Sequence, residues 1–117
     1  MKLVIVASLC ISFSSSGLCG PNDAEWNPPA RYDHEYGGKL IEKYLPQEQV
    51  VKECKKLFKR FNFSLDSVTS SQRGCSAGDK NVCTIIVIDK PYKLATPKSV
   101  RRHEIGHCNG WGFNHEE

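Results

Sequence analysis

The sequence has no apolar run long enough to cross a membrane. Its longest run, residues 3–13, falls well short of the roughly 20 apolar residues that a membrane-spanning helix needs, so we expect no membrane span. Lys2 precedes the run and small polar residues follow it, which is the layout of a secretory signal peptide. We therefore predict a signal peptide over residues 1–19 and a mature, secreted or periplasmic chain over residues 20–117. A buried N-terminal strand and a membrane anchor are the alternative interpretations.

The sequence also lacks a concentration of charge of one sign. Its 16 Lys and Arg and 13 Asp and Glu residues leave a net charge of +3 that is spread along the chain. The most basic stretch, residues 52–60, alternates charged with apolar residues at helical spacing, which is typical of a solvated helix face. A nucleic-acid-binding surface would need a larger basic patch, so we expect no nucleic-acid partner.

The chain is too short for a large hydrophobic core. Residues 20–117 form one small domain, which we expect to be a monomer and to depend on covalent cross-links. Four cysteines follow the predicted signal peptide: Cys54, Cys75, Cys83 and Cys108. An even number of cysteines in a secreted chain predicts two disulfides, with three possible connectivities. We favour Cys75 with Cys83 and Cys54 with Cys108, because the first pair brackets one polar loop.

The first part of the mature chain contains one clear helix signal. Residues 21–38 are rich in Pro, Gly and Asn and are predicted to be an irregular arm. The stretch 39–44 fits either a short strand or a helical turn. Pro46 suits a first helical turn, and the apolar residues after it recur at helical spacing, which predicts an amphipathic helix over residues 46–60. Residues 64–82 are polar and are expected to form a long loop.

The last part of the chain contains a strand signal and a second helix signal. Residues 83–89, CTIIVID, are a continuous stretch rich in β-branched residues, which predicts a buried strand. This strand is a candidate edge for binding an extended peptide, although its burial is typical of a central strand. Thr96 or Ser99 can cap the second helix, with Pro97 in its first turn and Gly110 at its end. These elements predict an α+β fold: a small single domain, with a short sheet packed on two helices and stapled by disulfides.

Three of the four histidines lie close to the end of the sequence. His103 and His107 are four residues apart, and Glu104 follows the first of them. On a helix, positions four apart share one face, so both imidazoles can bind one ion, and zinc takes histidine nitrogen at about 2.0–2.1 Å. Glu104 points to the side of such an ion, where a general base accepts a proton from a metal-activated water. The spacing predicts one zinc ion beside a catalytic Glu104.

Residues 103–107, HEIGH, resemble the active-site helix of the zincin metallopeptidases. Gluzincins take a third zinc ligand from a glutamate on a later helix, whereas metzincins continue with a glycine and a third histidine. Only ten residues follow His107, and Gly110 has the position of the metzincin glycine. The resemblance therefore implies His115 as the third zinc ligand, so that His103, His107 and His115 hold the ion.

The chain departs from the metzincin pattern in two respects. His115 lies two residues later than the pattern requires, and Gly112 gives the intervening loop the freedom to bulge. The only methionine is Met1, so the methionine turn of metzincins is missing. With Cys108, Gly110 and Trp111 after the motif, the chain is more similar to small secreted bacterial proteins that carry His-Glu-x-x-His-Cys-x-Gly-Trp and a later histidine.

The resemblance implies a zincin-like metallopeptidase domain over residues 20–117. Its expected activity is a secreted zinc-dependent endopeptidase that hydrolyses a peptide bond of a protein or of a cell-wall peptide. The alternative is a non-enzymatic, disulfide-stapled domain that binds zinc or a partner. Cys108 could then close a structural zinc shell. Cys108 follows His107 directly, however, and on a helix it points about 100° away, so that a disulfide is its expected use.

Overall fold

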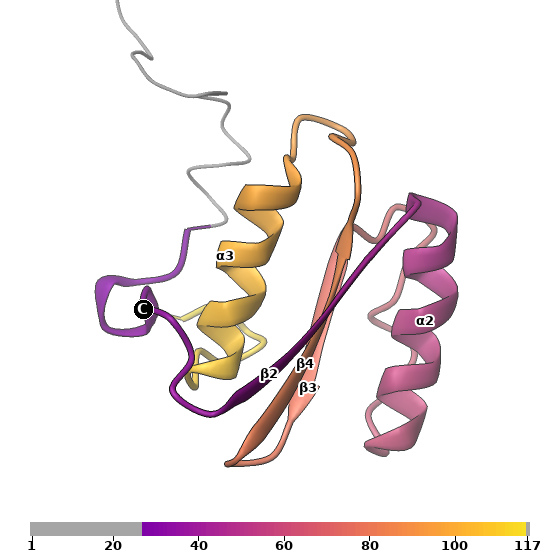
Figure 1. The fold of residues 1–117 in the computed structure, drawn as a ribbon. Helices are drawn as coiled ribbons and strands as arrows, with labels where there is room; N and C mark the ends of the chain where they lie inside the picture. Colours follow the sequence, from indigo (N-terminus) through magenta and orange to yellow (C-terminus); the bar gives the residue numbers. More distant parts are fainter. Residues whose placement is uncertain (1–26, 117) are drawn as a thin grey trace, which may run out of the picture.

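Three strands form a mixed sheet with one helix on each face (Figure 1). The computed structural model describes residues 27–116. The predicted signal peptide, and the arm up to residue 26, lie outside this range. The described residues form the predicted α+β domain, with a short sheet, two helices and two disulfides. Among these residues, no helix combines the length and the apolar character that crossing a bilayer requires.

The predicted buried strand is the central strand of the sheet. β4 (Val82–Ile88) lies between β2 (Lys39–Leu45), which is parallel to it, and β3 (Gly74–Gly78), which is antiparallel. Every β4 residue from Cys83 onward is buried, because both helices pack on it. Its continuous apolar sequence is therefore that of a strand covered on both faces. The candidate role of residues 83–89 as a peptide-binding edge is wrong, since both edges of β4 are already paired.

The two helices bury different faces of the sheet. α2 (Gln47–Arg60) presents its apolar stripe to β3 and β4 through Val50, Cys54, Leu57 and Phe58. α3 (Pro97–Cys108) covers the other face of the same two strands. Before β2, the described part of the arm contains a single turn of 3-10 helix, η1 (Ala30–Tyr32), which contacts α3.

β3 lies inside the segment that the sequence predicts to be a loop. The strand begins with Gly74 and ends with Gly78, and glycine is uncommon in strands. Close packing against α3 explains the glycine at position 74. A Cβ atom on Gly74 would lie 2.5 Å from the Val100 side chain and 2.8 Å from the Ile86 carbonyl oxygen. Only a glycine lets α3 approach the strand this closely. Glycine and serine are weak strand formers, so propensity alone indicates a loop here, and tertiary packing overrides it.

The disulfides are Cys54–Cys75 and Cys83–Cys108, so the predicted pairing is wrong. Cys75 lies opposite Ile86 and Cys83 lies opposite Gly78 in the β3–β4 register. Opposed residues share a face and successive residues alternate, so these two cysteines point to opposite faces of the sheet. Cys75 therefore meets Cys54 of α2, and Cys83 meets Cys108 of α3. Each bond ties one helix to the sheet.

The connection from β4 to α3 contains a tight turn that glycine would suit better. Tyr92 and Ala95 exchange backbone hydrogen bonds of 2.9 and 3.0 Å, and the two residues between them, Lys93 and Leu94, have φ of 47° and 71°. Positive φ at both central positions is the geometry for which Asn-Gly is preferred. Leu94 is 59 % exposed, so its side chain adds little packing.

We expect Leu94→Gly to raise the free energy of unfolding by about 0.5–1 kcal/mol, because leucine is disfavoured in the left-handed region. Urea denaturation measures the change. Leu65→Gly is the matched control, since Leu65 is also exposed but has no positive φ, and there glycine should destabilise the fold. A destabilised Leu94→Gly variant would contradict this account of the turn.

Candidate metal centre

The helix that carries the motif begins at a capping box. The Thr96 hydroxyl accepts a hydrogen bond from the Ser99 backbone N–H, and the Ser99 hydroxyl accepts one from the Thr96 N–H, each at 3.0 Å. Both residues predicted as alternative caps thus act together, and Pro97 occupies the first helical position. The cap sets the start of α3, and the four-residue spacing within the helix places His103 and His107 on one face.

Gly110 turns the chain back at the other end of α3. The last helical residue is Cys108, and Gly110 follows with φ of +109°. Its N–H donates to the His107 carbonyl at 3.0 Å, and the Trp111 N–H donates to the Gly106 carbonyl at 3.1 Å. This is the Schellman arrangement, in which glycine is preferred because the position is left-handed. The predicted stop at Gly110 is therefore confirmed, and the turn directs the C-terminal segment back across the helix.

The three predicted ligands converge on one point. The Nε2 atoms of His103, His107 and His115 form a triangle in which each side is 3.2 Å. Two nitrogens bound to a tetrahedral zinc ion at about 2.0–2.1 Å would lie about 3.3 Å apart. The triangle therefore fits one metal ion, and it brings together residues that are up to twelve positions apart in the sequence.

His107 is held in the tautomer that metal binding requires. Its Nδ1 lies 2.8 Å from the Trp111 carbonyl oxygen, which can only accept a hydrogen bond. Nδ1 therefore carries the proton, and the lone pair of Nε2 faces the other two histidines, whose Nε2 atoms lie 3.2 Å away. Burial lowers the pKa of His107 to about 4, with the hydrogen bond to Trp111 opposing this shift and the charge of His115 adding to it. The ring is thus neutral at neutral pH.

Trp111 fixes the segment that returns His115 to the helix. Its indole ring stacks on the His107 ring at 4.8 Å, and its Nε1 donates to the Glu116 carbonyl at 2.9 Å. Trp111 is 4 % exposed although it lies just beyond the helix. His115 closes a turn by donating its backbone N–H to the Gly112 carbonyl at 2.9 Å, and it has φ of 60°. The two extra residues of the loop are accommodated in this way.

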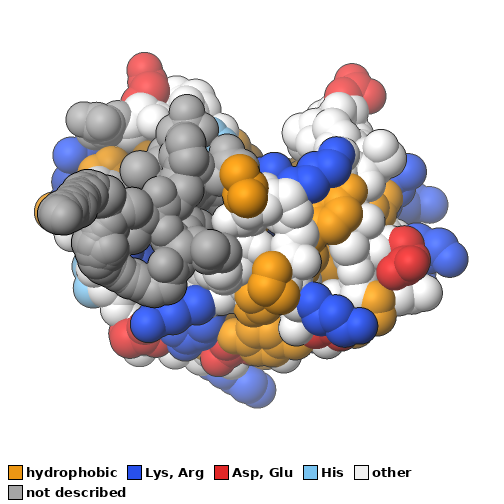
Figure 2. All heavy atoms as spheres, turned by 90° about the horizontal axis from the view of Figure 1, so that it is seen from above, with side chains coloured by type: hydrophobic (Ala, Val, Ile, Leu, Met, Phe, Trp, Pro, Cys, Tyr) orange, Lys and Arg blue, Asp and Glu red, His pale blue; other side chains and the backbone are white. Residues whose placement is uncertain are grey.

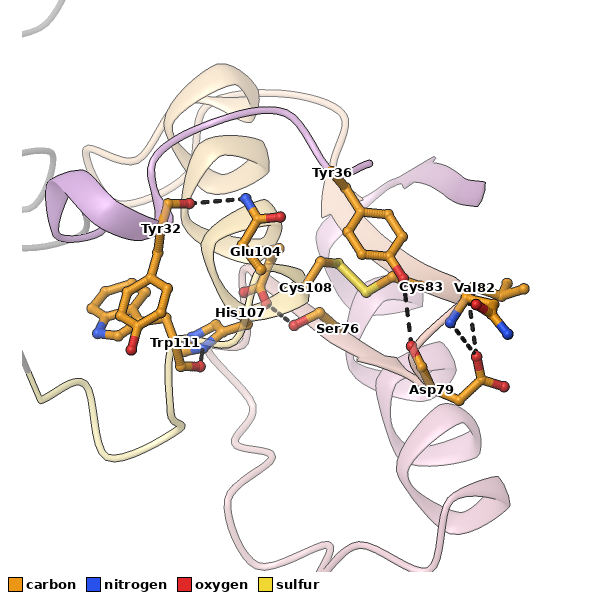
Figure 3. The surroundings of a disulfide bond; sticks show 12 residues. Tyr32, Tyr36, Ser76, Asp79, Val82, Cys83, Glu104, His107, Cys108 and Trp111 are labelled. Atoms are coloured by element: carbon orange, nitrogen blue, oxygen red, sulfur yellow. Dashed lines mark hydrogen bonds between the residues drawn. A yellow bond between two sulfur atoms is a disulfide. The ribbon is translucent and has the colours of Figure 1, made fainter. Parts of the chain in front are cut away.

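Glu104 lies buried between α3 and β3. It is 5 % exposed, and Oε1 accepts a hydrogen bond of 2.8 Å from the Ser76 hydroxyl (Figure 3). Desolvation by burial raises the pKa of Glu104 to about 7, and the bond from Ser76 opposes the rise. A carboxyl group whose pKa lies near neutrality can both accept and return a proton. The sequence does not indicate that Ser76 contacts Glu104, because the segment around Ser76 is predicted to be a loop.

A small cavity opens beside His107. It has a volume of about 120 Å³ and is lined by residues 76–79 of β3 and its turn, by His107, by the Cys83–Cys108 disulfide, and by Phe63 and Phe113. Seen from above, the molecule is indented between its α3 side and its α2 side (Figure 2). The same view shows basic and acidic side chains interspersed, in keeping with the dispersed charge of the sequence.

The other face of α3 is occupied by the N-terminal arm. Arg101 binds the carboxylates of Glu35 in the arm and Glu42 in β2, and Arg102 binds Asp33 in the arm. Exposed pairs of this kind contribute little individually. The closer contact is apolar: Pro28 is buried against Gly106, where a Cβ atom would lie 2.5 Å from the proline ring and 3.2 Å from the Trp111 ring.

We expect Gly106→Ala to lower the free energy of unfolding by about 1–3 kcal/mol through overpacking, even though alanine favours a helix by about 1 kcal/mol. Gly37→Ala is the matched control, because nothing lies within 4 Å of a Cβ atom there. Guanidinium denaturation of both variants checks the prediction. Equal stability of the two would show that Pro28 does not pack on α3 in solution.

Comparison of the chain with protein-family models, with curated proteins and with solved structures finds no match. The resemblance to zincins therefore rests on the HExxH motif and the residues around it. His34, the fourth histidine, is exposed and lies outside the cluster. Cys108 forms a disulfide, so its sulfur is not a free thiolate that could bind a metal.

Proposed function

We propose that the protein is a secreted zinc-dependent endopeptidase that uses Glu104 as its general base. The observation that carries this proposal is the triangle of Nε2 atoms, each 3.2 Å from the other two, on the helix that also bears the buried Glu104. The two disulfides support secretion, because such bonds persist in oxidising compartments.

The ligand set favours an open site over a closed structural one. Structural zinc sites use four protein ligands, whereas catalytic sites use three and leave one position for water or substrate. Among the described residues, the cluster comprises His103, His107 and His115 alone. Cys108 is the residue best placed to be the fourth ligand of a structural zinc site, but its sulfur is bonded to Cys83.

A bound Zn²⁺ would supply Lewis-acid activation of water and stabilise negative charge on the scissile carbonyl oxygen. The residues of the chain then have distinct roles. Glu104 takes a proton from the attacking water and afterwards passes it to the leaving amine, which restores the carboxylate. Ser76 holds Oε1 of Glu104, so that Oε2 stays available for this transfer. Trp111 keeps His107 in the tautomer described above.

The free edge of β3 suits an extended peptide. The Arg73 backbone carbonyl accepts a hydrogen bond from the Ile88 N–H, and the Asp79 backbone N–H donates to the Val82 carbonyl. Hydrogen-bonded pairs alternate along antiparallel strands, so the odd-numbered residues of β3 direct their backbone groups to β4. The backbone groups of Ser76 and Gly78 therefore point away from β4. These two residues line the cavity beside His107. A peptide bound here by strand addition would pass the metal centre.

The proposal is tested with the full chain, exported to an oxidising compartment and loaded with one equivalent of zinc. We expect it to cleave members of a quenched fluorescent peptide library, to lose this activity with 1,10-phenanthroline, and to regain it when zinc is restored. Stoichiometric zinc without any cleavage would favour the alternative, a zinc-binding domain without catalysis.

A further inference from the structure

The outer face of α2 gathers positive charge in one place. α2 lies at one side of the molecule, with the sheet on its inner side (Figure 1). The cations of residues 52–60 are all exposed, and they recur at the spacing of a single helix face, opposite the residues that pack on the sheet. We call this set the basic stripe: Lys52, Lys55, Lys56, Lys59 and Arg60.

The basic stripe is largely unneutralised. Lys56 shares the Glu53 carboxylate with Lys43, at 3.3 and 3.9 Å, and among the described residues the other four cations of the stripe form no ion pair. Since the whole chain carries +3 and the stripe carries +5, the remaining residues together carry −2. The fold therefore turns the basic stretch of the sequence into one exposed surface with excess positive charge.

Exposed aromatic side chains continue from the end of the basic stripe. Arg60 lies over the Phe61 ring, 5.9 Å from its centre. The Phe61 ring lies 5.8 Å from the Phe63 ring, which in turn lies 5.8 Å from the Phe113 ring. Phe63 is 36 % exposed and Phe113 is 56 % exposed. We call these three phenylalanines the apolar patch.

The apolar patch adjoins the metal centre. The Phe113 ring lies 5.1 Å from the His107 ring, in the loop that carries His115. α2 and α3 run in the same direction on opposite faces of the sheet, so their C-terminal ends lie at the same end of the molecule (Figure 1). A partner bound to both the stripe and the patch would therefore lie beside the three histidines.

This combination of charge and aromatic side chains fits an anionic lipid surface. Each Lys or Arg near such a surface raises partitioning roughly fivefold, and exposed aromatic residues enter the boundary between headgroups and acyl chains. A soluble polyanion would use the cations but would have no need of the phenylalanines. A second copy, related by a two-fold axis, would bring two basic stripes together, and like charges repel.

We propose that the protein docks peripherally on an anionic phospholipid surface through the basic stripe and the apolar patch. The docked orientation would hold the metal centre close to the lipid. The inference does not depend on the proposed function, because no cation of the stripe and no residue of the patch has a role in the proposed reaction.

Vesicle sedimentation tests the proposal with the chain recovered after export to an oxidising compartment. One set of vesicles contains phosphatidylglycerol and phosphatidylcholine in equal parts, and the other contains phosphatidylcholine alone. We expect partitioning onto the anionic vesicles to be higher by about tenfold or more, and to vanish in about 1 M salt, where the screening length is about 3 Å. Equal partitioning onto both vesicles, or none onto either, would overturn the proposal.

A pair of charge-reversed variants tests the basic stripe. Lys55→Glu/Lys59→Glu should lower partitioning onto the anionic vesicles by more than about tenfold. Lys90→Glu/Lys98→Glu is the matched control, because it changes the net charge equally at two exposed lysines outside the stripe and should have a much smaller effect. Equal losses in both variants would show that binding follows the net charge, and would reject the stripe as the docking surface.

A second pair of variants tests the apolar patch. Phe113→Ser should lower partitioning onto the anionic vesicles by about fivefold or more, because an exposed ring no longer enters the lipid. Leu94→Ser is the control, since Leu94 is 59 % exposed but precedes the other end of α3. Far-UV circular dichroism verifies that every variant folds.

Two further results would assign the surface to another partner and reject lipid docking. Binding to soluble polyphosphate as tight as binding to the anionic vesicles, and unaltered by Phe113→Ser, would indicate a polyanion site. A lipid-free dimer in analytical ultracentrifugation that Phe113→Ser dissociates would indicate a second copy of the chain. A monomer that prefers the anionic vesicles, and that both test variants weaken, is the result that we expect.

Discussion

Replacing Glu104 with glutamine is expected to lower kcat by about 10²–10⁴-fold while zinc stays bound, because the amide cannot accept the proton of the attacking water. Glutamine has nearly the same shape, and its amide oxygen can still accept the bond from Ser76. The fold and the free edge of β3 should therefore be unchanged. Cleavage of the best library peptide, measured beside zinc content, checks the prediction.

The same substitution should stabilise the metal-free protein at alkaline pH. The pKa of Glu104 is about 7 in the folded state, against 4.5 for the free side chain. Between these values the folded state binds more protons than the unfolded state, so stability falls as pH rises and stays lower above pH 7. The shift corresponds to about 3 kcal/mol, which glutamine removes. We expect the gain of Glu104→Gln in urea denaturation to be large at pH 8 and small at pH 4.

Glu48→Gln is the matched control for both experiments, because Glu48 is an exposed glutamate in the first turn of α2. It should leave cleavage and zinc content unaltered. Full activity of Glu104→Gln would reject Glu104 as the base. An equal stability change at pH 4 and pH 8 would show that Glu104 is not buried as described.

Replacing His115 with alanine is expected to weaken zinc binding by more than about 10²-fold. Loss of a group that only orients a metal ligand typically costs 10–100-fold in affinity, so loss of a ligand itself should cost more. His115 closes the triangle on the side away from the helix, 3.2 Å from both other Nε2 atoms. Without it, two histidines on one face of α3 remain. Competition with a chromophoric chelator measures the change.

His34→Ala is the control for this experiment, because His34 is exposed and lies outside the cluster. Far-UV circular dichroism verifies that both variants fold. Undiminished zinc affinity of His115→Ala would mean that the third ligand is another group. The resemblance to metzincins would then lose its most distinctive element.

Local sequence signals predict α3 and its ends well. The spacing of His103 and His107, the cap at Thr96 and the stop at Gly110 depend on contacts within a few residues. The buried strand over residues 83–89 is similarly evident from its run of β-branched residues. These features are local consequences of helix geometry, capping and side-chain shape.

The parts that the sequence does not reveal depend on contacts between distant segments. Gly74 has no side chain, which lets α3 pack closely against β3. The same packing brings the Ser76 hydroxyl within hydrogen-bond distance of Glu104. If β3 is predicted to be a loop, the sequence does not show that Cys75 and Cys83 point to opposite faces of the sheet. The disulfide pairing then cannot be predicted either. The cavity has the same origin, since Phe63 and Phe113 meet only in the folded chain.

The most direct test of the central claim, a three-histidine metal centre with an open fourth position, is X-ray absorption at the zinc edge on the zinc-loaded full chain. We expect a first shell of nitrogen and oxygen at about 2.0–2.1 Å, with the outer-shell pattern of three imidazoles and no sulfur. No retained zinc after dialysis of a folded protein would contradict the claim. A sulfur neighbour at about 2.3 Å would contradict it equally, because Cys108 would then be a ligand rather than half of a disulfide.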